Sequence, residues 1–133
     1  MDGVMQRMTG SEVQCAREVL GLERADLARL LGNDPATVRD WERGKSLVPY
    51  RVREQIGELE ALTTQAVEHL VAQLRQMQHP RAVVYREADE PESEDVARLG
   101  RGWWRAVAAQ AASQVPGTRI GTRPEFDAMS HEA

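Results

Sequence analysis

The side chains best suited to chemistry lie in a short basic segment, residues 34–53 of this 133-residue chain. The segment holds five basic side chains against three acidic ones, and the basic ones are Arg39, Arg43, Lys45, Arg51 and Arg53. Clustered Lys and Arg side chains neutralise phosphate groups, so the segment favours a nucleic-acid partner. The whole chain carries a net charge of −4, which argues against binding through total charge alone. The distribution of the cations therefore matters more than their sum.

Catalytic and metal chemistry find no support in the sequence. His69, His79, His131 and the single Cys15 show no metal-ligand spacing. No Ser-His-Asp or Cys-His order, phosphate-binding glycine loop or carboxylate pair stands out. We therefore expect no metal, no cofactor and no enzymatic activity, and we expect Cys15 to be a small buried hydrophobe on the first helix.

Two short helices are expected before the basic segment. Thr9, followed three residues later by Glu12, is a capping-box pattern that predicts a helix running to about Leu20. A second, amphipathic helix follows and ends at Gly32-Asn33, a pair suited to a left-handed C-cap.

The basic segment itself is expected to form a third helix and the start of a fourth. Asp34 suits an N-cap and Pro35 suits the first helical position, so the third helix begins there and ends at Gly44. A longer amphipathic helix starts at Pro49, with a possible break near Thr63-Thr64. Its apolar stripe fits either an intramolecular bundle or a dimer seam, and we expect both in different segments.

The C-terminal part has weaker patterns. Residues 81–86 have the composition of one short strand, which needs a partner strand. The acidic residues 87–95 are typical of a solvated loop, and residues 96–112 are expected to be helical. Because Trp103 and Trp104 are adjacent, a helix cannot bury both on one face, so we expect one in the core and the other at an interface.

Residues 28–44 carry the most specific motif, and they resemble the helix-turn-helix of Cro-type transcriptional regulators. In that family a small residue lets the two helices cross closely, a glycine makes the turn, and a threonine, an apolar residue and a Trp-Glu pair follow. The matching residues here are Ala28, Gly32, Thr37, Val38, Trp41 and Glu42. The match covers Gly10 to Ala61 and ends in Trp-Glu-Arg-Gly.

The resemblance implies that the third helix enters the major groove of DNA with its N-terminal half toward the base edges. It assigns base reading to Ala36, Thr37, Arg39 and Asp40, while Pro35 stands where the family often has a polar reader. Arg39 is the leading reader, because a guanidinium can bond guanine O6 and N7 together, worth about 1–3 kcal/mol of discrimination. On the helix pattern alone, Arg39 is equally an ordinary solvated residue.

The resemblance also implies which residues hold the DNA backbone. Arg24, Arg43, Lys45 and Ser46 match positions where the family binds phosphate, which sets the register on DNA and not the sequence. Glu23 and Arg24 depart from the serine and glutamine that are common there.

A second resemblance covers nearly the whole chain. It is to anti-CRISPR-associated repressors and their bacterial relatives, which join this motif to a C-terminal dimerisation region with a strand and repress operons of mobile elements, commonly their own. The residues that carry it are Trp41 to Pro49, Pro80 with Val83-Val84-Tyr85, and Gly102-Trp103-Trp104-Arg105.

Together these patterns predict a mainly α protein: a lambda-repressor-like helix-turn-helix bundle, then a helical dimerisation region containing a short β-strand. We expect the DNA-binding domain at residues 8–62, the dimerisation region at 63–122 and a flexible tail at 123–133. The residues expected to serve dimerisation are Tyr85, Trp103 and Trp104.

The functional hypothesis is a cytoplasmic, homodimeric repressor that binds double-stranded DNA at an inverted repeat. No apolar stretch is long enough to span a bilayer, and no signal peptide is apparent. Two alternatives remain open at this stage. One is an antitoxin whose C-terminal half binds a protein partner, and the other is an interaction adaptor that no longer binds DNA.

Overall fold

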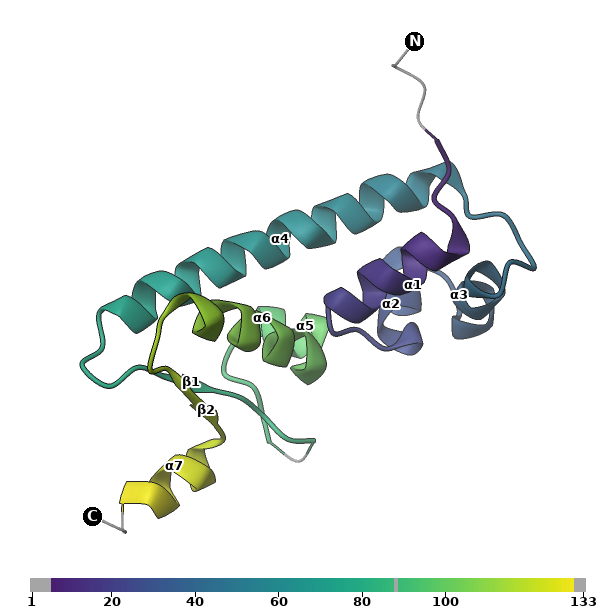
Figure 1. Cartoon of the computed structure of the whole chain (residues 1–133). Helices are drawn as coiled ribbons and strands as arrows, with labels where there is room; N and C mark the ends of the chain where they lie inside the picture. Colours follow the sequence, from purple (N-terminus) through teal and green to yellow (C-terminus); the bar gives the residue numbers. More distant parts are fainter. Residues whose placement is uncertain (1–5, 88, 131–133) are drawn as a thin grey trace. The chain divides into compact units, whose positions relative to one another are not determined.

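A computed structural model of the chain describes residues 6–87 and 89–130 (Figure 1). These residues are mainly helical, with one small parallel sheet of two strands, so the predicted fold class is confirmed at this level. The chain divides into two compact units, Met1–Leu62 (unit 1) and Thr63–Ala133 (unit 2). None of the helices within the described residues combines the length and the apolar character needed to cross a membrane.

Unit 1 contains α1 (Gly10–Val19), α2 (Arg24–Leu31), α3 (Pro35–Glu42) and the first half of α4 (Tyr50–Arg75). The predicted caps are confirmed. Thr9 Oγ1 accepts from the Glu12 amide at 3.0 Å while Glu12 Oε1 accepts from the Thr9 amide at 2.8 Å, which completes the capping box of α1. At α3, Asp34 accepts from the amide of Thr37 at 3.1 Å and Pro35 holds the first helical position.

Two glycines end α2 and α3 and let the chain turn sharply after each helix. Gly32 and Gly44 both adopt a φ of 76°, a left-handed conformation that favours glycine. The following amides bond back into each helix: Asn33 N donates to Ala28 O at 2.8 Å, and Lys45 N donates to the carbonyl of Asp40 at 2.8 Å. Both ends thus satisfy carbonyl groups that a helix terminus leaves free.

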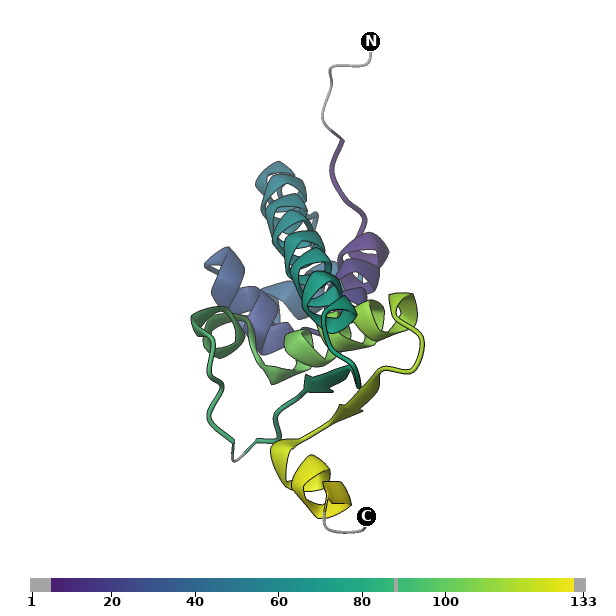
Figure 2. The ribbon, with the colours of Figure 1, turned by 90° about the vertical axis from the view of Figure 1, so that its left-hand side faces the viewer.

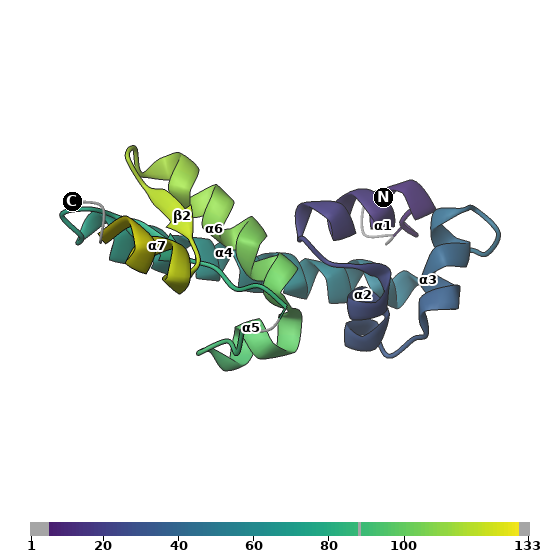
Figure 3. The ribbon, with the colours of Figure 1, turned by 90° about the horizontal axis from the view of Figure 1, so that it is seen from below.

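The core of unit 1 lies between α1, α2, α3 and the start of α4. In Figure 3, α2 and α3 lie side by side and are joined by a short turn. The fully or nearly fully buried apolar side chains are Val13, Leu20, Leu22, Leu27, Ala28, Leu31, Val38, Trp41, Val48, Val52 and Ile56.

One core prediction is wrong, because Cys15 is exposed. The buried positions of α1 are Val13 and Arg17, four residues apart on one face. Cys15 lies two residues from each and therefore points to the opposite side of the helix.

Helix α4 runs without interruption from Tyr50 to Arg75, so the possible break at Thr63-Thr64 does not occur. Two β-branched residues weaken a helix only slightly, and burial of Thr63 adds packing there. Its apolar face supplies Val52 and Ile56 to the core of unit 1 and, further along, the buried Val67, Leu70, Val71 and Leu74 of unit 2.

Unit 2 contains a parallel pair of strands between two helices (Figure 2). Strand β1 (Arg81–Val83) pairs in register with β2 (Arg119–Gly121). The first strand confirms part of the predicted segment 81–86. Its partner was not predicted, because three residues of which one is glycine give too weak a periodic signal.

The predicted helix at 96–112 is two helices, α5 (Glu94–Leu99) and α6 (Arg101–Gln114), separated at Gly100. The two tryptophans of α6 pack within unit 2. Trp103 is buried and its Nε1 donates to Thr63 Oγ1 at 2.9 Å, while the half-buried Trp104 donates to the carbonyl of Val83 at 2.7 Å. Trp103 is therefore a core residue, which corrects its expected role as a dimer contact.

The predicted flexible tail at 123–133 is also wrong for its described part. Residues 123–130 form α7 (Arg123–Ser130), while residues 131–133, including His131, lie outside the described residues. The Thr122 amide donates to Glu125 Oε1 at 2.7 Å, and the Glu125 amide donates to Thr122 Oγ1 at 3.3 Å. Phe126 of this helix is buried. This Thr-x-x-Glu pattern is a capping box, which is a sequence signal for a helix that starts here.

Gly10 offers a test of how tightly α1 packs on α3. A Cβ at Gly10 would lie 1.7 Å from the carbonyl oxygen of Trp41, which is backbone and cannot move aside cheaply. We expect Gly10→Ala to lower the free energy of unfolding by about 3 kcal/mol, the upper range for overpacking. Urea denaturation followed by circular dichroism measures this.

Gly57→Ala is the matched control for Gly10→Ala. Gly57 is exposed inside α4, and a Cβ there would meet nothing within 4 Å. We expect a gain of about 0.5–1 kcal/mol, because alanine is the better helix former. Equal effects of the two substitutions would show that α1 does not approach α3 this closely.

Candidate nucleic-acid interface

The exposed face of α3 and the loop after it carry three cations. Arg39 and Arg43 lie one helical turn apart on the exposed side, and Lys45 is exposed just beyond the helix. Val38 and Trp41 point the other way into the core. Within residues 6–87 and 89–130 no side chain forms an ion pair or hydrogen bond with any of these three cations. They are therefore available to an external anion.

Two further cations of the basic segment hold the fold together instead. Arg51 donates to the carbonyl of Leu31 at 3.1 Å and to Asn33 Oδ1 at 2.9 Å, and so ties α4 to the turn between α2 and α3. Arg53 donates to the carbonyl of Gln6 at 2.8 Å. The five cations of residues 34–53 therefore separate into two that hydrogen-bond to the chain itself and three that have no such partner among the described residues.

The first turn of α3 is organised by its own cap. Thr37 Oγ1 donates to Asp34 Oδ1 at 2.9 Å, in addition to the amide bond described above. These hydrogen bonds from Thr37 lower the pKa of Asp34 below its ordinary value. The hydroxyl proton of Thr37, one of the predicted base readers, is thus engaged within the cap, which leaves its lone pairs and methyl group for other contacts.

The other predicted readers differ in exposure. Ala36 and Pro35 are exposed, and Asp40 is half-buried. No ion pair joins Asp40 to Arg39 among the residues that the structure describes. Ser46, a predicted phosphate contact, is exposed.

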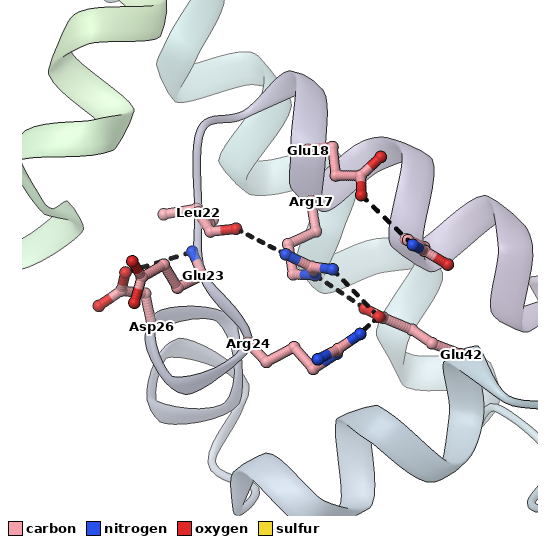
Figure 4. A network of polar contacts seen from close by, with 8 residues as sticks. Arg17, Glu18, Leu22, Glu23, Arg24, Asp26 and Glu42 are labelled. Carbon is pink, nitrogen blue, oxygen red and sulfur yellow. Dashed lines mark hydrogen bonds and ion pairs between the residues drawn. The ribbon is translucent and has the colours of Figure 1, made fainter.

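A buried carboxylate at the end of α3 connects all three short helices (Figure 4). Glu42, whose side chain is only 2% exposed, accepts from Arg17 of α1 through Nε at 2.8 Å and Nη2 at 3.1 Å. Its Oε1 also accepts from Arg24 Nε of α2 at 2.9 Å. Arg17 further donates to the carbonyl of Leu22 at 3.1 Å, which fixes the connection between α1 and α2.

The charges in this network stabilise one another. Burial opposes ionisation of Glu42, but the hydrogen bonds from Arg17 and Arg24 outweigh it, so the pKa of Glu42 lies below its ordinary value. The hydrogen bonds that Arg17 donates to Glu42 raise the pKa of Arg17, against the opposing effect of burial. The carboxylate therefore stays charged and satisfied although it is almost inaccessible to water.

Arg24, a predicted phosphate contact, is both a member of this network and open to solvent. Its side chain is 44% exposed, and only its Nε faces Glu42. Within the described part of the chain its two terminal nitrogens have no partner. Arg24 can therefore hold Glu42 with one nitrogen and offer the other two to a phosphate.

Sequence reasoning recognised Glu42 as a motif residue but missed its partner Arg17 and the role of Arg51. The signal for Arg17 was its spacing of four from Val13, which places a charge within the buried stripe of α1 and implies a buried counter-charge. No comparable signal marked Arg51, since its partners are a carbonyl group and an amide.

The chemistry available here is anion binding. The described residues include no group of three or more His, Cys, Asp or Glu side chains that could hold a metal ion. No protein-family model matches the chain, and no curated protein matches it either.

Substitution of Glu42 tests whether the buried network organises unit 1. Glu42→Gln leaves Arg17 buried without a counter-charge, so we expect a loss of about 3–5 kcal/mol of stability. Arg24→Gln removes the exposed partner and is expected to cost at most about 1 kcal/mol. Urea denaturation of both variants distinguishes them, and similar losses would contradict the central place of Arg17 and Glu42.

Ionisation of the Glu42 carboxylate makes the stability of the fold depend on pH. Because the pKa of Glu42 is lower in the folded protein than its ordinary 4.5, its contribution is complete above pH 4.5 and is lost as the pH falls through the folded value. Stability measured from pH 6 down to pH 3 should therefore fall less steeply in Glu42→Gln than in the wild type. Asp34 and Glu125, whose pKa values are also lowered, contribute to the slope that remains. Parallel curves for the two proteins would be inconsistent with an ionised Glu42 in the fold.

Proposed function

We propose that the chain is a sequence-specific DNA-binding repressor of transcription, in which α2, the turn after it and α3 form a Cro-type helix-turn-helix. The observation that carries this proposal is the set of free cations on the exposed face of α3 and the loop that follows. Arg39, Arg43 and Lys45 have no internal partner among the described residues, whereas the neighbouring arginines Arg17 and Arg51 are engaged within the fold.

Each of the exposed residues has a role in this proposal. Arg39 projects from the middle of α3 and reads guanine through O6 and N7, with Ala36 available to a thymine methyl group. Arg43, Lys45 and Ser46 bind phosphates beyond the end of the helix, and Arg24 binds one beside α2. With Thr37 engaged in its cap, direct readout depends mainly on Arg39.

We further propose that the repressor acts as a homodimer on an inverted repeat. One eight-residue helix contacts few base pairs. The α3 helix of a second copy, one turn of the DNA helix away at about 34 Å, doubles the number of base pairs that are read. The half-buried Tyr85 and Trp104 remain the proposed dimer contacts. The second resemblance extends the proposal to autoregulation of a mobile-element operon.

DNA binding by the full chain tests the proposal. Duplexes selected from a random-sequence library supply the site, and fluorescence anisotropy at several salt concentrations measures affinity. We expect Arg39→Ala to lose about 1–3 kcal/mol of discrimination at one base pair of each half-site. Lys45→Ala should instead weaken binding to all duplexes alike and reduce the salt slope by about 1.

The control for both variants is Arg75→Ala, which removes an exposed arginine near the end of α4. We expect it to bind like the wild type. Failure of the wild-type chain to enrich any duplex, or equal effects of all three substitutions, would refute the proposal.

A further inference from the structure

Two arginines of unit 2 are held side by side, and neither has a counter-charge within residues 63–87 and 89–130. The in-register pairing of β1 with β2 places Arg81 directly opposite Arg119. Residues paired across neighbouring strands project from the same face of the sheet, and like charges at such positions are destabilising. Arginine also keeps its charge in proteins, so the repulsion cannot be relieved by loss of a proton.

The surroundings of the two guanidinium groups orient them without neutralising them. The central guanidinium carbon of Arg81 lies 4.9 Å from the centroid of the Phe126 ring, and Arg119 Nη2 lies 3.9 Å from the sulfur of Met129. Phe126 and Met129 both belong to α7. Among the described residues neither arginine forms an ion pair. Other arginines of unit 2 do: Arg86, Arg98 and Arg123 pair with Glu125, Asp95 and Glu92.

The two arginines line an open cavity of about 630 Å³. Gln78 and His79 before β1, Gly117 before β2 and Met129 of α7 are among the other residues that line it. No carboxylate is found among the described residues that line the cavity. Its volume falls within the range of small-molecule sites and far exceeds the space that a simple inorganic ion needs.

We propose that this cavity binds a small organic anion through a phosphate or carboxylate group held between Arg81 and Arg119. Planar guanidinium groups bind such oxyanions bidentately, and an anion placed between them converts their repulsion into two attractive contacts. The cation–π contact with Phe126 holds the Arg81 guanidinium in place without using its N–H groups as hydrogen-bond donors, so that they can serve the ligand. Gln78 and His79 add hydrogen bonds to the organic part.

The test is calorimetric titration of the full chain, without DNA, with three probes: adenosine monophosphate, citrate and inorganic phosphate. We expect saturable binding of at least one of the two organic anions below about 10 mM and weaker binding of inorganic phosphate. The comparison between the nucleotide and citrate separates a phosphate ligand from a carboxylate ligand. No binding of either organic anion would overturn the proposal.

Variants locate the binding. Arg119→Gln should weaken it about tenfold or more, as expected for the loss of charged hydrogen bonds, and Arg119→Lys should retain part of it. Arg75→Gln, an exposed arginine that does not line the cavity, should bind like the wild type. Circular dichroism confirms that each variant is folded. An equal loss in Arg75→Gln would show general charge attraction and contradict a site.

A further measurement, duplex-DNA binding by Arg119→Gln, distinguishes anion binding in this cavity from DNA binding. If Arg119→Gln weakens binding to duplex DNA while the wild type binds none of the small anions, the two arginines serve a nucleic-acid backbone and the proposal fails. Because the titration contains no DNA, its result stands independently of the repressor function.

Discussion

Unit 1 depends on one interaction, the burial of the Glu42 carboxylate between Arg17 and Arg24. A carboxylate that is 2% exposed is costly unless its charge is balanced and its oxygens accept hydrogen bonds. Here the partners come from α1 and α2, so the cost is offset only when all three helices are assembled. The interaction therefore specifies the arrangement of α1, α2 and α3 as well as stabilising it, and it sets which face of α3 remains outside.

Four arginines of unit 1 form two groups with different tasks. Arg17 and Arg51 donate to a carboxylate, an amide oxygen and carbonyl groups of the chain, and in doing so fix the ends of α2 and α3. Arg39 and Arg43 have no such partner among the described residues and project from α3. The net charge of the chain, −4, conceals this division, because an ionic partner of the protein meets only the second group. The proposed DNA interface follows from position and not from total charge.

Sequence patterns predicted much of unit 1 because its helices have strong local signals. Caps at Thr9 and Asp34 and the stops at Gly32 and Gly44 depend on neighbouring residues alone, and all are found. The long-range contacts were beyond such signals: Arg17 with Glu42 spans 25 residues, and β1 pairs with a strand 38 positions later. For the site, exposure of Arg39 was foreseen, whereas the engagement of Thr37 in its cap and of Arg51 in the turn depends on geometry. Helix α7 was predicted as a flexible tail although its capping box, Thr122 with Glu125, is a local signal in the sequence.

Arg17 and Glu42 are internal, and we propose that the exposed face of α3 contacts DNA. The most direct measurement is a titration of the ¹⁵N-labelled full chain with a selected duplex, following the Nε–Hε resonances of the arginines by NMR. From this arrangement we expect the Arg39 and Arg43 signals to shift and saturate with the duplex while the Arg17 signal stays in place. Shifts confined to arginines of unit 2, or a displaced Arg17 signal with Arg39 unmoved, would contradict it.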